Sequence, residues 1–286
     1  MMDSQELPAG DARRRRKGIY MLPNLITLAA LFGGFYAIVM AMNGEFGAAA
    51  SGVFAAMVLD GMDGRVARMT GTQSAFGEQM DSLSDMVSFG AAPALVAYVW
   101  ALQPLGKAGW FAAFIYCACA ALRLARFNVN TAVVDKRYFQ GLPSPAAAAL
   151  VTGFVWLTSA VVRVHHEVPM FHELVSALGG QRVARGDFSW LMFAVTLFAG
   201  LSMVTNTPYY SFKDWGGKRS VPFVVLVLAA LLLAVVSVEP PTVLFLLFVG
   251  YALSGYAVYA WRKAKGQHAS IVSTSTDEPD ERGLHD

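Results

Sequence analysis

Charged residues are scarce in this chain of 286 residues: they make up 15% of it, against about 25% in a typical soluble domain. Hydrophobic residues account for 56%, and the mean hydropathy is +0.47. A water-soluble fold of this size would have to expose much of that apolar surface to solvent. The shortage of charge therefore excludes an ordinary soluble domain and indicates a membrane protein.

Cysteine is almost absent. Cys117 and Cys119 are the two that occur, and they lie two residues apart in one apolar run. Two cysteines so placed cannot form a disulfide framework or a zinc site of ordinary spacing. An excess of positive charge is missing as well, because the formal net charge is +2. Nucleic acid is therefore not an expected partner.

Long hydrophobic runs are what the chain has in abundance. About 20 apolar residues cross the hydrocarbon core as a helix, and we find eight runs of this kind: 22–42, 46–64, 82–103, 108–127, 142–163, 188–206, 221–238 and 242–261. Several are rich in Gly, Ala and Ser, which let helices approach closely in a membrane. The sequence predicts an all-α integral membrane protein, a polytopic bundle of about eight transmembrane helices.

Lys and Arg set the expected orientation. If the N-terminus is cytoplasmic, 18 basic residues fall in the inside segments and 4 in the outside segments. Positive residues favour the cytoplasmic side, so both termini are expected there. We expect disordered cytoplasmic tails at residues 1–18, which are basic, and 266–286, with one transmembrane domain at 19–265.

Carboxylates gather at the cytoplasmic ends of the second and third runs. Asp60 and Asp63 share one helix face, and Asp81 and Asp85 share a face of the next helix. Two antiparallel helices joined by a short turn would bring all four together. Four carboxylates cannot all stay ionised unaided at close range, and two divalent cations would balance them. An all-oxygen ligand set favours Mg²⁺ or Mn²⁺ over zinc. The alternative from spacing alone is an interfacial loop whose charges face water.

Glycine, alanine and arginine residues also occur at set spacings from the four aspartates in this segment. The full pattern is Asp60-x2-Asp63-Gly64-x2-Ala67-Arg68-x8-Gly77-x3-Asp81-x3-Asp85. It resembles, without a mismatch, the motif of the CDP-alcohol phosphatidyltransferase family. That resemblance implies a reaction in which an acceptor hydroxyl attacks the lipid-side phosphorus of a CDP-linked lipid and CMP leaves. It also implies two divalent cations, Mg²⁺ or Mn²⁺, in each active site and a homodimer.

The resemblance assigns expected roles to particular residues. The metal ligands would be Asp60, Asp63, Asp81 and Asp85, and Asp85 would also be the catalytic base. The residues expected to contact the CDP-lipid are Asn24, Asp60, Gly64, Arg68, Ser74 and Gly77, with Gly77 keeping the cytidine pocket open. Asn24 enters through Pro23-Asn24 and Thr27, which resemble a family motif at the start of the first helix. Its alternative role is capping of that helix.

Later motifs resemble the branch of the family that uses L-serine. They are Ser88-Phe89-Gly90 with Ala92-Pro93, the run 123–128, Tyr138-Phe139-x-Gly141 to Pro145, and the run 208–213. A guanidinium suits bidentate binding of a carboxylate. We therefore expect Arg123 or Arg126 to bind the serine carboxylate, with help from Asn128 or Ser144. The alternative is that both arginines are positive-inside anchors.

The leading hypothesis is transfer of a phosphatidyl group from CDP-diacylglycerol to L-serine, giving phosphatidylserine and CMP at the cytoplasmic face of the inner membrane. The second is a sister enzyme whose acceptor is glycerol 3-phosphate, an inositol phosphate or choline. A cation-coupled transporter would be expected to show internal repeats and acids near the midplane, and a scaffold gives no reason for four aspartates in register.

Overall fold

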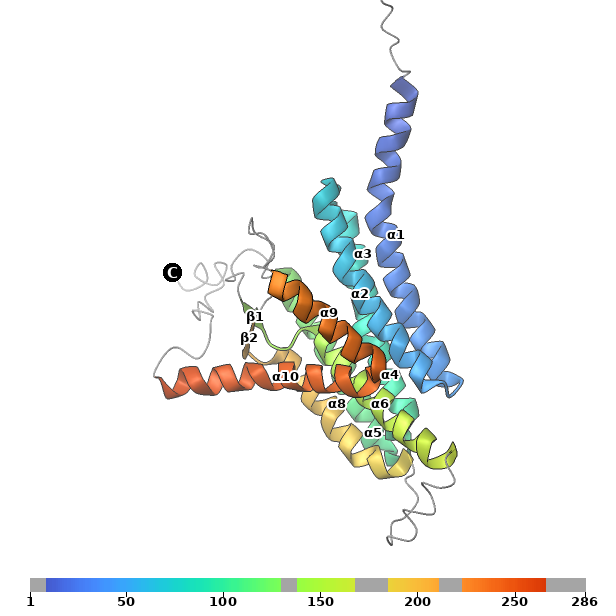
Figure 1. Cartoon of the computed structure of the whole chain (residues 1–286), viewed down its shortest axis with the longest axis vertical. Coiled ribbons are helices and arrows are strands. Elements are labelled where there is room, and N and C mark those ends of the chain that lie inside the picture. Colours follow the sequence, from blue (N-terminus) through green and yellow to red (C-terminus); the bar gives the residue numbers. More distant parts are fainter. Residues whose placement is uncertain (1–8, 130–137, 168–184, 211–222, 266–286) are drawn as a thin grey trace, which may run out of the picture.

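The computed structural model describes residues 9–129, 138–167, 185–210 and 223–265 (Figure 1). The α-helices are α1 (Ala9–Met42), α2 (Phe46–Thr70), α3 (Ala75–Asp85), α4 (Ala92–Ala97), α5 (Lys107–Val129), α6 (Ser144–Glu167), α8 (Ser189–Val204), α9 (Phe223–Val238) and α10 (Pro240–Ala264). The strands are β1 (Tyr138–Gln140) and β2 (Pro208–Tyr210). The expected disordered tail 266–286 lies outside the described residues.

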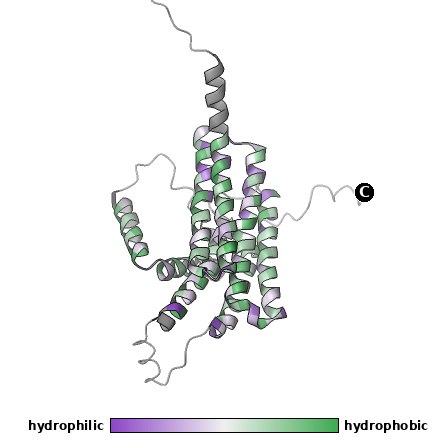
Figure 2. Ribbon diagram, turned by 90° about the vertical axis from the view of Figure 1, so that its right-hand side faces the viewer, coloured by the Kyte–Doolittle hydropathy of each residue, from purple (hydrophilic) through white to green (hydrophobic). Residues whose placement is uncertain are grey.

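Seven described helical segments are long and apolar enough to cross a membrane. They are Met21–Met42, Phe46–Thr70, Ala75–Leu105, Lys107–Val129, Ser144–Arg163, Arg185–Val204 and Pro240–Ala264. Hydrophobic residues predominate along them, as Figure 2 shows. The prediction of an all-α polytopic membrane protein is confirmed.

The predicted number of eight spans is not confirmed. Within the run 221–238, the described residues form the helix α9, which has 16 residues. At 1.5 Å per residue this helix is about 24 Å long, short of the roughly 30 Å hydrocarbon core.

Two helices begin earlier than the hydropathy of the chain predicts. The first helix starts at Ala9, so residues 9–18 are helical and the prediction of a disordered tail is wrong for them. The third span begins at Ala75 because Ser74 caps it, its hydroxyl accepting a hydrogen bond from the Gly77 amide at 3.1 Å. A count of apolar residues does not detect polar residues at the end of a helix. The first helix and the third span therefore begin earlier than that count predicts.

The third span is not a uniform α-helix. Between α3 and α4 lies a π-helical segment, Met86–Ala91, and a second one, Tyr98–Leu102, follows α4 before a short 3₁₀ turn, Gln103–Leu105. The first π segment starts directly after Asp85. π-helical turns are rare, and they occur frequently at functional sites.

Small residues bring α1 against its neighbours, as the sequence predicts. A Cβ atom on Gly33 would lie 2.9 Å from the Gly52 carbonyl oxygen of α2. One on Gly34 would lie 2.6 Å from the Cα atom of Ser88 in the third span. The three helices run side by side in Figure 1, and glycine is required at these crossings because even a methyl group would overlap.

The strands β1 and β2 form a two-stranded antiparallel sheet. Tyr138 of β1 is paired with Tyr210 of β2, and the Leu142 amide donates to the Ser202 carbonyl at 2.9 Å. The sheet thereby ties the start of α6 to the end of α8. The Tyr209 hydroxyl donates to the Ala252 carbonyl of α10 at 2.9 Å, and burial raises the pKa of that hydroxyl.

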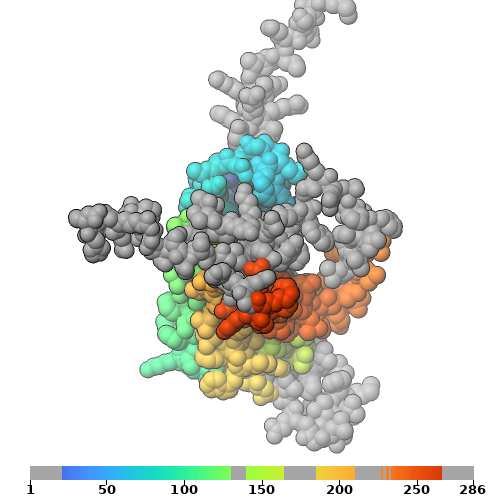
Figure 3. Space-filling model, turned by 90° about the vertical axis from the view of Figure 1, so that its left-hand side faces the viewer, coloured from blue at the N-terminus to red at the C-terminus, as the bar shows by residue number. Residues whose placement is uncertain are grey.

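The helix α10 crosses the bundle at a steep angle to α1 and α2 in Figure 1. In the space-filling view of Figure 3, α2 and α3, in cyan, form one end of the described surface. The helices α8, in amber, and α10, in red, lie further along the same face.

Candidate active site

The turn between α2 and α3 is short and is built from residues suited to it. Gly71 ends α2 in a left-handed conformation with φ of +64°, which a glycine adopts without strain. Three residues later Ser74 caps α3. The two helices therefore run antiparallel with their aspartates at adjacent ends, as the sequence predicts.

Three of the four predicted metal ligands converge. Asp60, Asp63 and Asp81 each offer a carboxylate oxygen, and these oxygens lie within 4.8 Å of one another. Asp63 is buried, and the other two are partly buried. Oxygens this close together, all from carboxylates, are the kind of ligand set that Mg²⁺ and Mn²⁺ prefer.

Asp85 lies one helical turn beyond Asp81. Its carboxyl group lies beside that of Asp60, so the fourth predicted ligand adjoins the other three. Its Oδ1 atom is buried and has no hydrogen-bond partner among the described residues. A buried carboxylate oxygen without a partner is costly, and a bound cation would supply what it lacks. The residues present therefore fit a divalent ion.

The position of Asp63 is determined by the first helix. The Thr27 hydroxyl donates to Asp63 Oδ2 at 2.6 Å, and the Gly64 amide donates to the other carboxylate oxygen. Thr27 is itself held in place, because its carbonyl accepts from the Ser84 hydroxyl of α3 at 3.2 Å. One threonine thus joins α1, α2 and α3 at the aspartate cluster.

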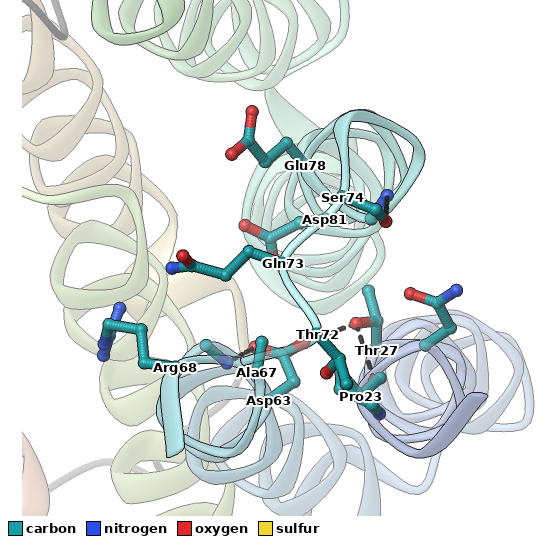
Figure 4. Close-up of a pocket in the computed structure, with 13 residues that line it drawn as sticks. Pro23, Thr27, Asp63, Ala67, Arg68, Thr72, Gln73, Ser74, Glu78 and Asp81 are labelled. Atoms are coloured by element: carbon teal, nitrogen blue, oxygen red, sulfur yellow. Dashed lines mark hydrogen bonds between the residues drawn. The ribbon is translucent and has the colours of Figure 1, made fainter. Parts of the chain in front are cut away.

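A cavity of about 210 Å³ opens beside the aspartates. Its lining residues are Pro23, Asn24, Thr27, Asp63, Gly64, Ala67, Arg68, Thr72, Gln73, Ser74, Gly77, Glu78 and Asp81. In Figure 4, Asp63 and Asp81 lie on either side of the hollow, and Arg68 and Glu78 lie further out. Five of the six residues predicted to contact the CDP-lipid are in this lining. The sixth, Asp60, is outside it.

Gly77 and Asn24 are close neighbours in the cavity wall. A Cβ atom on Gly77 would lie 3.2 Å from Ser74 Oγ and 3.3 Å from Asn24 Oδ1. Glycine therefore leaves room for the Asn24 side chain, which lies within α1 and lines the cavity. The prediction that Asn24 caps the start of a helix is wrong, because α1 begins fifteen residues earlier, at Ala9.

The four residues predicted to bind serine do not form one group in the structure, because their hydrogen-bond partners differ. Arg123 and Ser144 are joined, the Arg123 Nη1 atom donating to Ser144 Oγ at 2.9 Å. Arg126 instead donates to Asn206 Oδ1 at 3.0 Å, and the Asn128 amide donates to Ser82 Oγ at 3.1 Å. Of the motif at 208–213, the residues 208–210 form β2, and 211–213 lie outside the described residues.

Some lining residues were not predicted from the sequence. Thr72, Gln73 and Glu78 line the cavity, and they belong to the turn and the first turn of α3. They could have been identified from the sequence by their position between Arg68 and Asp81, inside the motif. The bond between Thr27 and Asp63 had no such signal, because 36 residues separate the two.

Comparison with known proteins gives consistent matches. The family described as CDP-alcohol phosphatidyltransferase matches residues 20–181, which include all four aspartates. A Helicobacter pylori protein named CDP-diacylglycerol–serine O-phosphatidyltransferase is 34% identical over 245 residues, 85% of this chain and 92% of that protein.

Two further proteins of that name match about half of the chain. The Mycobacterium leprae protein is 40% identical over 149 residues, 50% of this chain and 49% of its own. The Saccharomyces cerevisiae protein is 36% identical over 149 residues, 47% of this chain and 53% of its own.

Proposed function

The chain belongs to the CDP-alcohol phosphatidyltransferase family, and from this membership we propose that it transfers the phosphatidyl group of CDP-diacylglycerol to the hydroxyl of L-serine. The products are phosphatidylserine and CMP. The observation that carries the proposal is the convergence of Asp60, Asp63 and Asp81 beside a polar cavity. The names of its relatives favour serine as the acceptor.

The aspartates would hold two divalent cations, Mg²⁺ or Mn²⁺. Asp60, Asp63 and Asp81 have oxygens close enough to share an ion, and the unpartnered Oδ1 atom of Asp85 supports a further ligand position. When bound, the cations would neutralise the diphosphate of the donor and the charge that develops on the departing CMP. Thr27 and Gly64 hold the Asp63 carboxylate in a single orientation for this purpose.

The cavity would receive the CDP portion of the donor. Arg68 supplies a positive charge for a phosphate, and Asn24 and Ser74 supply polar groups for the nucleotide. Gly64 and Gly77 leave the backbone open to close approach. Asp60 lies outside the lining, and we assign it to the cations alone.

Asp85 would act as the catalytic base. Its carboxylate takes the proton of the serine hydroxyl, and the serine oxygen forms a bond to the lipid-side phosphorus. The bond between that phosphorus and the oxygen of CMP then breaks, and CMP leaves with the electron pair. A positioned base of this kind contributes about 10²- to 10⁴-fold to the rate.

We further propose that both termini are cytoplasmic, that the site faces the cytoplasm across the inner membrane, and that the protein is a homodimer. The basic residues favour this orientation by 18 to 4. The homodimer rests on the resemblance to the family. Labelling of single cysteines introduced near each terminus would test the orientation, and the mass of the purified protein in detergent would test the dimer.

The experiment that tests the function is a panel of acceptors. Purified protein in detergent is given CDP-diacylglycerol, Mg²⁺ or Mn²⁺, and labelled L-serine, glycerol 3-phosphate, an inositol phosphate or choline. We expect labelled lipid and CMP with serine alone. Lipid product with one of the other alcohols and none with serine would identify a sister enzyme instead.

A further inference from the structure

The third span contains a π-helical turn, Met86–Ala91, directly after Asp85, and Tyr116 of α5 is hydrogen-bonded to it. Resting on the proposed role of Asp85 as the catalytic base, we infer that this turn sets the position of the Asp85 carboxylate. Tyr116 is then a positioning residue, which acts on the reaction through the backbone of the third span and touches no substrate.

The turn is explained by the proline that follows it. In an α-helix the amide of residue 93 would donate to the carbonyl of residue 89. Residue 93 is Pro93, in the first turn of α4, and proline has no amide hydrogen to donate. Its ring would also collide with the carbonyl of residue 89 in a regular α-helix. The Phe89 carbonyl therefore loses its α-helical donor, and the chain widens into a π-helical turn before Pro93.

Tyr116 supplies a donor to the carbonyl that the proline frees. Its hydroxyl donates to the Phe89 carbonyl oxygen at 3.0 Å, and its side chain is fully buried. A buried carbonyl without a donor is costly, and inside a membrane a neighbouring helix is a usual source of one. The bond therefore fastens α5 to the turn that follows Asp85.

The first helix holds the other side of the same segment. The Ser84 hydroxyl donates to the Thr27 carbonyl at 3.2 Å. The Ser88 hydroxyl donates to the Ala30 carbonyl at 3.1 Å. Both serines are buried, and they flank Asp85 in the sequence. The backbone around Asp85 is thus held by α1 on one side and by α5 on the other.

Asp85 depends on its backbone because its side chain is not fixed as that of Asp63 is. Both oxygens of Asp63 accept hydrogen bonds, one from Thr27 and one from Gly64. Asp85 Oδ1 is buried and has no hydrogen-bond partner among the described residues. A displacement of about 1 Å at a reacting group can cost about 100-fold in rate. A change in the turn should therefore be felt in the chemical step.

The competing explanation is that Tyr116 only stabilises the packing of α5 against the third span. The nucleotide cavity separates the two explanations, because its lining includes Asp81 but neither Asp85 nor any residue of the π-helical turn. Binding of the donor should therefore be insensitive to the turn, whereas turnover should depend on it.

Tyr116→Phe removes the hydroxyl alone, and Tyr256→Phe is the matched control. The Tyr256 hydroxyl is hydrogen-bonded to that of Ser202 at 2.7 Å and joins α10 to α8. In Tyr116→Phe we expect kcat for each donor-binding site to fall about 10- to 100-fold, with KM for CDP-diacylglycerol within about threefold of wild type. Both constants should stay within about threefold in Tyr256→Phe, even where the thermal midpoint falls equally in the two variants. Equilibrium binding of labelled CDP-diacylglycerol counts the sites, so a loss of folded protein is not mistaken for a loss of rate.

Pro93→Ala tests the route through the Phe89 carbonyl. The alanine amide can donate to that carbonyl, so the turn should close towards an α-helix and kcat should fall by a similar factor, again without a rise in KM for the donor. The double variant should be no slower than the slower single variant, because both changes act on one carbonyl. Pro93→Ala carries the test alone if Tyr116→Phe does not fold in detergent.

A wild-type kcat in Tyr116→Phe or in Pro93→Ala would overturn the inference. So would an equal loss of kcat in Tyr256→Phe, or a double variant whose loss is the product of the two single losses. The assay is CMP release with the alcohol that the wild-type protein uses. Turnover with another alcohol and none with serine would refute the proposed acceptor and leave the test of Tyr116 in force.

Discussion

At the scale of single residues, the hydrogen bond from Thr27 to Asp63 is the contact that makes the first helix part of the site. The bond is buried, its donor–acceptor distance is 2.6 Å, and it satisfies one carboxylate oxygen of a proposed metal ligand. Removing groups that orient a ligand typically costs about 10- to 100-fold in metal affinity. Thr27 is therefore a positioning residue.

We expect Thr27→Val to raise the Mn²⁺ concentration for half-maximal activity by about tenfold or more. Thr27→Ser keeps the hydroxyl and should restore the wild-type value. Mn²⁺ titration of the activity, and of the thermal unfolding midpoint in detergent, measures both. Equal Mn²⁺ dependence in Thr27→Val and wild type would show that the contact does not position Asp63.

Asp85→Asn removes the proposed base with little change of shape. Turnover should fall by about 10³-fold, in the range attributed to a positioned base, while binding of CDP-diacylglycerol partly survives. Single-turnover release of CMP gives the rate, and equilibrium binding of labelled donor gives the affinity. Substantial activity in this variant would rule out Asp85 as the base.

Gly77→Ala tests the nucleotide cavity. The added methyl group would press on Ser74 and Asn24 at 3.2 and 3.3 Å, so the Michaelis constant for CDP-diacylglycerol should rise several-fold. Gly61→Ala is the matched control, since no atom lies within 4 Å of its added Cβ. A similar rise in both variants would mean that helix propensity, and not the cavity, is responsible.

At the scale of helices, α1 fits against the third span through Gly34. The Cβ of Gly34→Ala would overlap the backbone of Ser88, so the two helices must separate. We expect a loss of about 1–3 kcal/mol in stability and a lower thermal midpoint in detergent. Gly250→Ala, in α10, meets no atom within 4 Å and should not lower the midpoint. A Gly34→Ala midpoint equal to that of wild type would contradict this packing.

The helices that carry the aspartates could be predicted because their signal is local. Aspartates three or four residues apart share a helix face, and α2 and the helix α3 keep that register. The π-helical turn after Asp85 could not be predicted, because its contacts join residues far apart in the chain, as in the Tyr116 hydroxyl bond to the Phe89 carbonyl at 3.0 Å. The strands β1 and β2 have three residues each, too few for a period, and they pair across about 70 residues of chain.

At the scale of the whole molecule, the aspartate cluster should couple metal binding to stability. An ion that binds only the folded arrangement stabilises it by mass action. We expect EDTA to abolish activity, and Mn²⁺ or Mg²⁺ to restore it and to raise the thermal midpoint by several degrees. A variant with Asn at 60, 63 and 81 should show no such rise. A rise of equal size in that variant would place the ion elsewhere.

Predictions of global arrangement were less complete than those for the site. Apolar runs identify spans one at a time, and seven of the eight correspond to described helices of sufficient length. The way in which the helices cross depends on long-range packing, and a single apolar run carries no information about that packing. The separate environments of Arg123 and Arg126 arise in this way, because their partners lie 21 and about 80 residues further along the chain.

The pairing of β1 with β2 has a consequence for the continuity of the chain. These strands, with the bond from Leu142 to Ser202, hold the start of α6 and the end of α8 together without help from the connection between those helices. A gene divided within that connection should therefore yield two polypeptides that reassemble in the same membrane. Synthesis of phosphatidylserine would require both fragments in one cell.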